Sequence, residues 1–223
     1  VDVKKRLKNI PKFIFPNKCP SCGSKTIKEF NSITKKKDAV RRGSSEGYFC
    51  EKISIEKLKH FVSKDAFNID GFGKKIVESF WNLKLVKYPY DIFDLDYKKI
   101  ETLDGWGKLS VENLKYAINV KKKISLQRFI YSLGIRHIGL ENARLLSKYF
   151  VSFSNFKELL INNKYDDLLN IDGIGETQIK SLEKFFQNKT NIKVVEKLSE
   201  ILIVKDREVK SKGKLKNVSF MFT

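Results

Sequence analysis

The sequence predicts a mainly α-helical protein in which four tandem helix–hairpin–helix motifs follow a small β-rich cysteine module. Three observations support this fold class: a glycine-centred pattern that occurs four times, apolar residues at helical spacing from about Ile53 onward, and the sequence CPSCG at 19–23. Of the 223 residues, 41% are hydrophobic and 12% aromatic, which is enough to build a real core.

The repeat is centred on four glycines at spacings of 34, 32 and 36 residues, namely Gly73, Gly107, Gly139 and Gly175. An apolar residue stands four positions before each glycine, one before it, and four and seven after it. Because the last two positions share one face of a helix, we expect each glycine to end a tight turn and an amphipathic helix to follow. In three repeats a second glycine stands two residues before the repeat glycine (Gly71, Gly105, Gly173). The third repeat has His137 at this position.

Such a hairpin is suited to binding a phosphate. The glycines let another backbone approach closely, and the next helix begins with free N–H groups and the positive end of its dipole. This arrangement reads no base, so it is typical of sequence-independent DNA binding. Glu176 follows the fourth hairpin directly, so we expect that hairpin to be the weakest. The predicted DNA-binding residues are Gly71, Phe72, Gly73, Lys74, Lys75, Gly105, Gly107, Lys108, Arg136, His137, Gly139, Gly173 and Gly175.

Other glycine motifs fit less well. A dinucleotide fingerprint needs a third glycine and a preceding strand, and a P-loop needs Gly-Lys-Ser/Thr at longer spacing. The KxDG motif of nucleotidyltransferases needs a lysine two positions before Asp, where this chain has Asn68, Thr102 and Asn170. His137 is interpreted as a turn residue that donates to phosphate or water, so no catalytic residue is predicted. A helical repeat with tight turns and no ligand stays open.

The formal net charge of +19, from 45 basic and 26 acidic residues, favours a polyanionic partner. Residues 1–64 hold 17 basic and 6 acidic side chains, so the charge is concentrated toward the N-terminus, although a coding bias toward lysine would explain part of it. The chain has no apolar run of membrane-spanning length and starts without the apolar stretch of a signal peptide. We therefore expect a cytoplasmic protein with no membrane partner. We also expect a monomer that, if it binds DNA, associates with the nucleoid.

The CPSCG sequence predicts a knuckle whose two thiolates reach one metal ion. Cys50 offers a third thiolate, so the predicted metal ligands are Cys19, Cys22 and Cys50. A structural zinc site prefers four ligands; His60, in the following predicted helix, is a poor fourth candidate, and a module without metal stays open. The redox interpretation of Cys-x-x-Cys needs a βαβ scaffold, which is not evident. Short β-like runs are expected at 25–30 and 47–50.

These motifs together resemble the C-terminal half of bacterial NAD-dependent DNA ligase. The resemblance rests on CPSCG, AVRR and a late cysteine, LKHFVSKDAFNIDGFG, LGIRHIG and NIDGIG, and it runs from about Phe15 to Val204. It implies four parts: 1–14, the tail of a truncated oligonucleotide-binding domain; 15–52, a zinc-finger-like cysteine module; 53–204, the helix-hairpin-helix domain; and 205–223, a linker and the start of a truncated BRCT domain.

Enzymes of that family seal nicks in duplex DNA: a lysine in their N-terminal half attacks NAD, AMP passes to the 5′-phosphate, and the 3′-hydroxyl displaces it. The resemblance implies that this chain binds duplex or nicked DNA in replication and repair. By the same resemblance, we expect this chain to lack the adenylation half with its catalytic lysine. That half would be a partner if separately encoded, and NAD would enter only through it. The family's third cysteine corresponds to Gly43, so zinc would rest on three cysteines. The alternatives are a stand-alone structure-specific DNA-binding protein, a decayed ligase fragment, or a helical interaction module with incidental charge.

Overall fold

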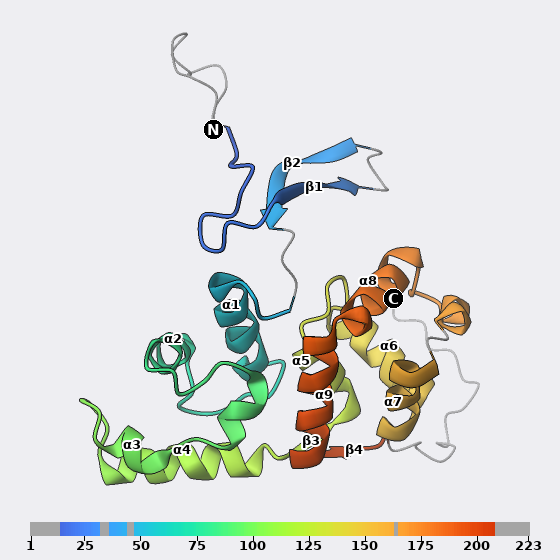
Figure 1. Cartoon of the computed structure of the whole chain (residues 1–223). Helices are drawn as coiled ribbons and strands as arrows, with labels where there is room; N and C mark the ends of the chain where they lie inside the picture. Colours follow the sequence, from blue (N-terminus) through green and yellow to red (C-terminus); the bar gives the residue numbers. More distant parts are fainter. Residues whose placement is uncertain (1–13, 32–35, 44–46, 163–164, 208–223) are drawn as a thin grey trace, which may run out of the picture.

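The computed structural model describes residues 14–31, 36–43, 47–162 and 165–207, and it confirms the predicted fold class (Figure 1). The helices are α1 (Glu51–Val62), α2 (Lys74–Asn82), α3 (Tyr97–Glu101), α4 (Lys108–Val120), α5 (Leu126–Ser132), α6 (Leu140–Phe150), α7 (Phe153–Asn162), α8 (Glu176–Gln187) and α9 (Lys189–Ile201), with the 3-10 turns η2 (Pro89–Phe93) and η3 (Asp166–Asn170). The strands are β1 (Thr26–Asn31), β2 (Lys36–Gly43), β3 (Lys123–Ser125) and β4 (Ile203–Lys205).

The fourfold repeat is visible in the helices. Helices α2, α4, α6 and α8 each begin one residue after a repeat glycine. The apolar positions four and seven residues after each glycine are all buried, as the helical spacing predicts: Val77, Phe80, Val111, Leu114, Ala143, Leu146, Ile179 and Leu182. The pattern in the sequence therefore reports the core-facing side of each of these helices.

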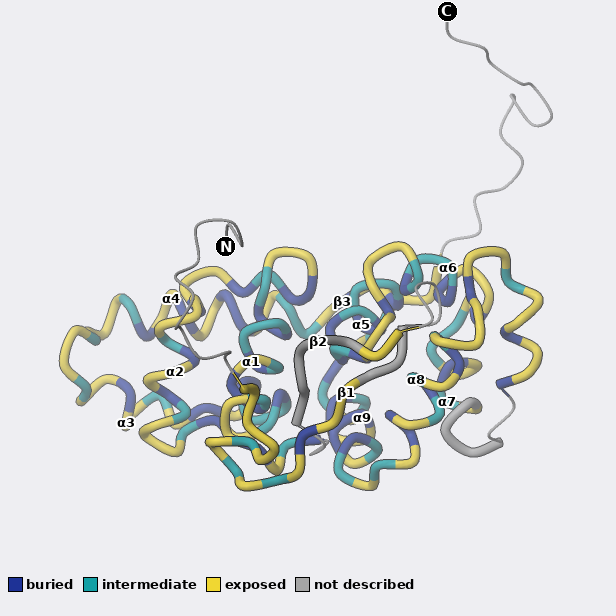
Figure 2. Tube along the Cα trace, turned by 90° about the horizontal axis from the view of Figure 1, so that it is seen from above, coloured by how far each residue is buried: buried dark blue, intermediate teal, exposed yellow. Residues whose placement is uncertain are grey.

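One continuous hydrophobic core joins the helices into a single unit. Phe156, on α7, is fully buried. The centroid of its ring lies 6.4 Å from the ring centroid of Phe129, 5.5 Å from that of Phe150 and 5.9 Å from that of Phe186. Figure 2 shows the buried residues along the inner sides of the helices, with exposed residues at the turns. The hairpin turns are thus displayed at the surface of a packed helical body.

The cysteine module differs from its sequence prediction in one strand. The run at 25–30 coincides with most of β1, but the run expected at 47–50 is wrong: this segment forms turns that lead into α1. The antiparallel partner of β1 is instead β2, with Thr26 opposite Gly43. Gly47 has a φ of +68°, which breaks an extended strand, and Cys50 is already the N-cap of α1. Figures 1 and 2 show this hairpin lying over the middle of the helical body.

Two contacts join parts of the helical region that lie far apart in the sequence. The Arg128 side chain, on α5, donates from Nε to the carbonyl of Ala66 at 2.7 Å and from Nη2 to that of Lys64 at 2.5 Å. Strands β3 and β4 pair in parallel, with the N–H of Ile203 donating to the carbonyl of Lys122 at 2.8 Å. Neither contact was predicted, because a single arginine and a three-residue strand leave no periodic signal.

Two sequence predictions concern the chain ends. The tail of a truncated oligonucleotide-binding domain at 1–14 and the start of a BRCT domain at 205–223 fall almost wholly outside the described residues. Across the part of the chain that is described, none of the helices combines the length and the apolar character needed to cross a bilayer.

The burial of Phe156 predicts that Phe156→Ala lowers the free energy of unfolding by about 3–5 kcal/mol, since it removes a fully buried ring and leaves a cavity. Urea denaturation followed by circular dichroism measures this change. Tyr116→Ala is the control, because Tyr116 is 71% exposed, and we expect a change within about 0.5 kcal/mol. Equal effects of the two substitutions would contradict the position of the core.

Candidate nucleic-acid interface

All four hairpins have the same backbone path. The residue two positions before the repeat glycine has a left-handed φ in every case: +75° at Gly71, +78° at Gly105, +58° at His137 and +90° at Gly173. Three of these residues are glycines, which adopt this region without strain. At Gly71 and Gly105 an added Cβ would meet no atom within 4 Å. Space for a side chain at such turns, and the tolerance of histidine for this φ, explain why His137 can replace glycine in the third repeat.

The apolar residue between the two positions anchors each turn. Its N–H donates to the carbonyl three residues earlier, at 3.2 Å for Phe72, 3.1 Å for Trp106, 3.1 Å for Ile138 and 2.9 Å for Ile174. Phe72, Ile138 and Ile174 are buried, and Trp106 is half-buried against the core. The turn is therefore held from inside, while the residues on either side of the anchor stay at the surface. Phe72, predicted as a contact residue, is turned into the core, so only its backbone can face a ligand.

Each repeat glycine is the N-cap of the helix that follows. Gly73, Gly107, Gly139 and Gly175 are exposed, and their extended backbone directs the first N–H groups of the helix outward. An added Cβ at Gly73, Gly107 or Gly139 would meet no atom within 4 Å. These N–H groups and the positive end of the helix dipole form a site that favours an anion.

The four sites are not equivalent, because two N-cap N–H groups already have an acceptor within the chain. The N–H of Gly107 donates to Oγ of Ser110 at 2.9 Å, and that of Gly175 donates to Oε1 of Gln178 at 3.1 Å. The corresponding residue is apolar Ile76 in the first hairpin. In the third it is Asn142, whose Nδ2 donates to the carbonyl of His137 at 2.8 Å. An anion at the second or fourth hairpin must therefore compete with a side chain for one donor.

The basic side chains near the hairpins also differ. Lys74, Lys75 and Lys108 are exposed beside the first and second hairpins, and Arg136 and His137 are exposed within the third. Glu176 follows the fourth and forms a 3.0 Å ion pair with Lys180, which lies on the same exposed surface of α8. Sequence reasoning identified the Glu176 charge but missed Ser110 and Gln178, although a polar residue three positions after an N-cap is a known capping signal.

Arg144, one turn into α6, is paired with Glu141. Its Nε lies 3.0 and 2.9 Å from the two carboxylate oxygens, and its Nη2 also contacts Oε1. These hydrogen bonds lower the pKa of Glu141. The charge of Arg144 is therefore partly matched before any ligand arrives.

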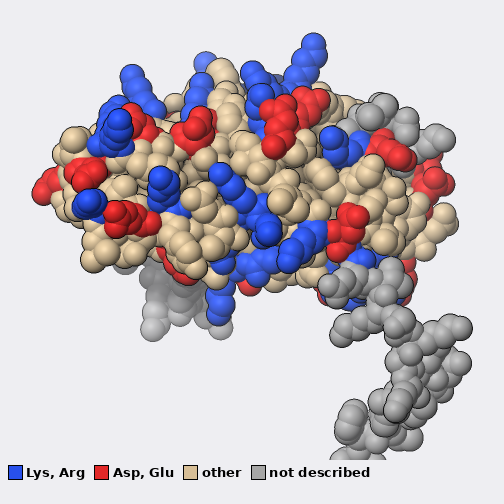
Figure 3. All heavy atoms as spheres, turned by 90° about the horizontal axis from the view of Figure 1, so that it is seen from below, with Lys and Arg blue, Asp and Glu red and all other residues tan. Residues whose placement is uncertain are grey.

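Net charge alone does not locate the interface. Figure 3 shows Lys and Arg side chains spread over the face of the molecule opposite the cysteine module, interspersed with Asp and Glu. Because mixed charges largely cancel beyond a Debye length, this face does not stand out as a polyanion site. The hairpin geometry is therefore the stronger indicator.

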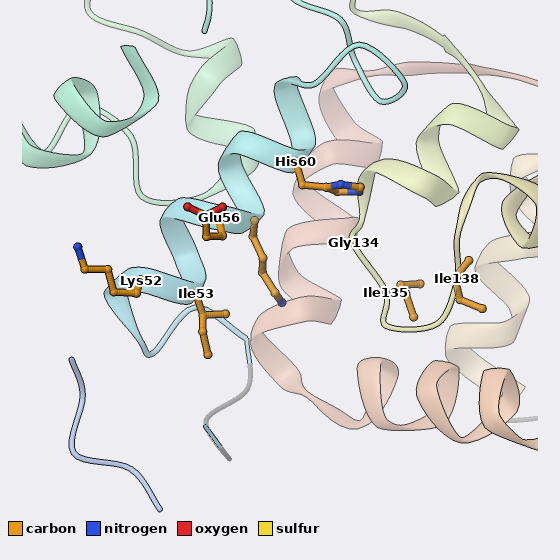
Figure 4. Close-up of a pocket in the computed structure, with 8 residues that line it drawn as sticks. Lys52, Ile53, Glu56, His60, Gly134, Ile135 and Ile138 are labelled. Atoms are coloured by element: carbon orange, nitrogen blue, oxygen red, sulfur yellow. The ribbon is translucent and has the colours of Figure 1, made fainter. Parts of the chain in front are cut away.

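An open groove of about 510 Å³ lies between α1 and the third hairpin (Figure 4). Figure 4 shows Lys52 and Glu56 pointing away from the opposite wall, where Ile135 and Ile138 lie. His60, on α1, has Nε2 2.8 Å from the carbonyl of Tyr131. Most of the groove surface is apolar, and His60 is engaged with the Tyr131 carbonyl, so the groove gives little support for a catalytic centre or an anion pocket.

The three cysteines predicted as metal ligands lie together. Their sulfur atoms are all within 4.8 Å of one another, and Sγ of Cys19 is 4.0 Å from Sγ of Cys50. The knuckle is closed by two backbone bonds: Gly23 N–H to the Cys19 carbonyl at 2.8 Å, and Cys19 N–H to the Ser24 carbonyl at 2.7 Å. Zinc–sulfur bonds of about 2.3 Å in a tetrahedron place sulfurs about 3.8 Å apart, so the cluster fits a metal ion. His60, held by Tyr131, does not belong to it.

Comparison with known proteins sets these features in a family context. A family model described as "Helix-hairpin-helix motif" matches residues 128–195. The chain is 63% identical over 224 residues to a protein named DNA ligase from Pelagibacter ubique (strain HTCC1062), covering 100% of this chain and 33% of that protein. Proteins of the same name from Wolbachia pipientis wMel and Rickettsia bellii (strain RML369-C) are 42% and 41% identical, covering 98% and 100% of this chain. The chain spans about a third of the length of these relatives.

The hairpin geometry predicts that Gly71→Ala and Gly173→Ala both destabilise the protein. Both substitutions put alanine at a left-handed φ, which costs about 1–2 kcal/mol. At Gly71 the new Cβ meets no atom within 4 Å, and at Gly173 it meets Cδ1 of Leu145, the end of a half-buried side chain that can turn aside. The two losses of unfolding free energy should therefore be similar. Unchanged midpoints of urea denaturation in both variants would contradict the turn geometry.

Proposed function

We propose that this chain, which corresponds over its whole length to the C-terminal part of DNA ligases, binds the sugar–phosphate backbone of duplex or nicked DNA through its helix-hairpin-helix motifs. The observation that carries this proposal is the fourfold recurrence of a surface turn whose helix N-terminus faces outward. Four anion sites of one design suit a polymer with regularly spaced phosphates. Because backbone contacts carry no sequence information, the binding is independent of base sequence.

The first and third hairpins are the stronger phosphate sites in this proposal. The first has two exposed lysines, and its apolar Ile76 offers no acceptor to the N–H of Gly73. The third carries Arg136 and His137 at its exposed turn. The second and fourth hairpins have internal acceptors in their capping side chains, and the fourth also has an acidic residue at the start of its helix. The second hairpin therefore joins the fourth as a weaker contact.

DNA binding should weaken when a bulky side chain covers the N-cap N–H groups. The double variant Gly73→Val and Gly107→Val is expected to fold, because both residues have negative φ and the added Cβ atoms meet no atom within 4 Å. We expect about a tenfold or greater loss of affinity for duplexes of any sequence, corresponding to about 1.4 kcal/mol or more. Fluorescence anisotropy at two salt concentrations measures it, since each phosphate contact adds to the salt dependence.

Gly175→Val is the matched control for this experiment. It blocks the N-terminus of α8, where Gln178 already accepts the N-cap hydrogen bond, so its effect on affinity should be smaller. Unchanged binding by the double variant would refute the hairpin assignment. Failure of the unmodified chain to bind DNA at low salt would instead favour a helical interaction module whose charge is incidental.

We further propose that this chain takes part in sealing nicks in duplex DNA. Ligase adenylation would take place on an N-terminal half, where NAD would be consumed, while the residues described above would hold the DNA. We expect this chain, mixed with a separately produced N-terminal half of a related ligase, to restore sealing of a nicked duplex in a gel assay. Binding of nicked DNA without any sealing would favour the second candidate, a stand-alone DNA-binding protein or a ligase fragment without enzymatic role.

We also propose that the cluster of Cys19, Cys22 and Cys50 holds zinc, the ion that the ligase resemblance implies. The bound ion would join the knuckle to the start of α1 and so fix the module on the helical body. Protein purified without chelators should contain about one zinc per chain by mass spectrometry of the metal. Less than about 0.1 zinc per chain would show that the module does not hold the ion.

A further inference from the structure

The cysteine cluster has one donor fewer than a closed tetrahedral zinc site requires. The whole chain contains three cysteines and two histidines. His60 is held at the carbonyl of Tyr131, His137 forms the turn of the third hairpin, and the cluster found among the described residues contains the three thiols alone. Among the described residues, a metal ion bound here would have three cysteine sulfurs and no histidine or carboxylate as ligands, which leaves one position to fill.

We propose that this fourth coordination position is open and binds a small thiol from solution. This inference rests on the zinc site proposed above. Zinc sites with three protein ligands keep an exchangeable water in the fourth position, and zinc bonds readily to a fourth thiolate. On a zinc ion held by the three cysteines, an incoming thiol would lose its proton to solvent and would take the place of the exchangeable water.

The exposure of the three thiols leaves a path to the ion. Cys50 is buried, with 1% of its surface exposed, and forms the base of the cluster at the N-cap of α1. Cys19 and Cys22 are half-buried on the knuckle, so with respect to the described residues solvent reaches the cluster on this side. Oγ of Ser24 lies 3.0 Å from Sγ of Cys22, where a hydrogen bond would hold this thiolate in position.

Charge also favours an anionic fourth ligand. Three thiolates on Zn²⁺ give a net charge of about −1, and a fourth gives about −2. Residues 15–52 hold nine basic and four acidic side chains, a net charge of +5, which stabilises such an anionic complex. A neutral or acidic module would oppose the fourth thiolate.

Zinc K-edge X-ray absorption tests the proposal on the zinc-loaded full chain. Before thiol addition, the first shell should contain about three sulfurs at about 2.3 Å and one nitrogen or oxygen at about 2.0–2.2 Å. Addition of reduced glutathione should raise the sulfur count to about four and remove the lighter ligand. Neither reading depends on DNA binding, and a zinc-loaded protein whose first shell ignores glutathione would refute this inference while leaving the zinc site and the DNA-binding proposal intact.

Gly43→Cys provides the matched control. Gly43 pairs with Thr26 in the β1–β2 ladder and stands where the family that this chain resembles has a cysteine, so a cysteine here is expected to supply the fourth sulfur. This variant should show four sulfurs without added thiol and should not respond to glutathione. Four sulfurs in the unmodified protein before thiol addition would overturn the proposal. A first shell that does not change with glutathione, or a protein that binds no zinc, would overturn it equally.

Discussion

Each of the four helix-hairpin-helix turns depends on one backbone constraint: a residue at positive φ directly precedes an apolar residue that packs into the core. The positive φ reverses the chain within a few residues, and burial of the apolar neighbour holds the reversal in position. Together they bring the next helix N-terminus to the surface with its first N–H groups directed outward. Without the residue at positive φ, the chain could not both bury the apolar residue and expose the N-terminus of the next helix, and the anion site would not form.

A second constraint joins the cysteine module to this helical body. Cys50 is at once a member of the thiol cluster and the N-cap of α1, where its carbonyl accepts hydrogen bonds from the N–H and the hydroxyl of Ser54, both at 2.9 Å. The third thiol is thereby fixed to the first helix, while the other two belong to the knuckle. A metal ion on the cluster would link two parts of the chain that are separated by the β1–β2 hairpin.

Sequence reasoning was most successful where a pattern repeats. The four glycines and their apolar neighbours predicted the starts of α2, α4, α6 and α8 and the residues that those helices bury, because one structural unit leaves the same signal four times. It failed where a local role depends on a partner far along the chain. The strand expected at 47–50 is a turn, because Cys50 is the N-cap of α1. The hydrogen bonds from Arg128 to the carbonyls of Lys64 and Ala66 could not be predicted from the local sequence. The internal acceptors Ser110 and Gln178 were a missed local signal.

The central claim is that hairpin N–H groups bind DNA phosphates, and that the first and third hairpins do so more strongly than the second and fourth. The most direct measurement is the backbone amide spectrum of ¹⁵N-labelled protein titrated with a short duplex at low salt. The amide signals of Gly73, Lys74, Gly139 and Leu140 should move most and in proportion to DNA bound, while those of Gly107 and Gly175 should move less. Large shifts elsewhere on the surface with the four hairpins unchanged would contradict the account.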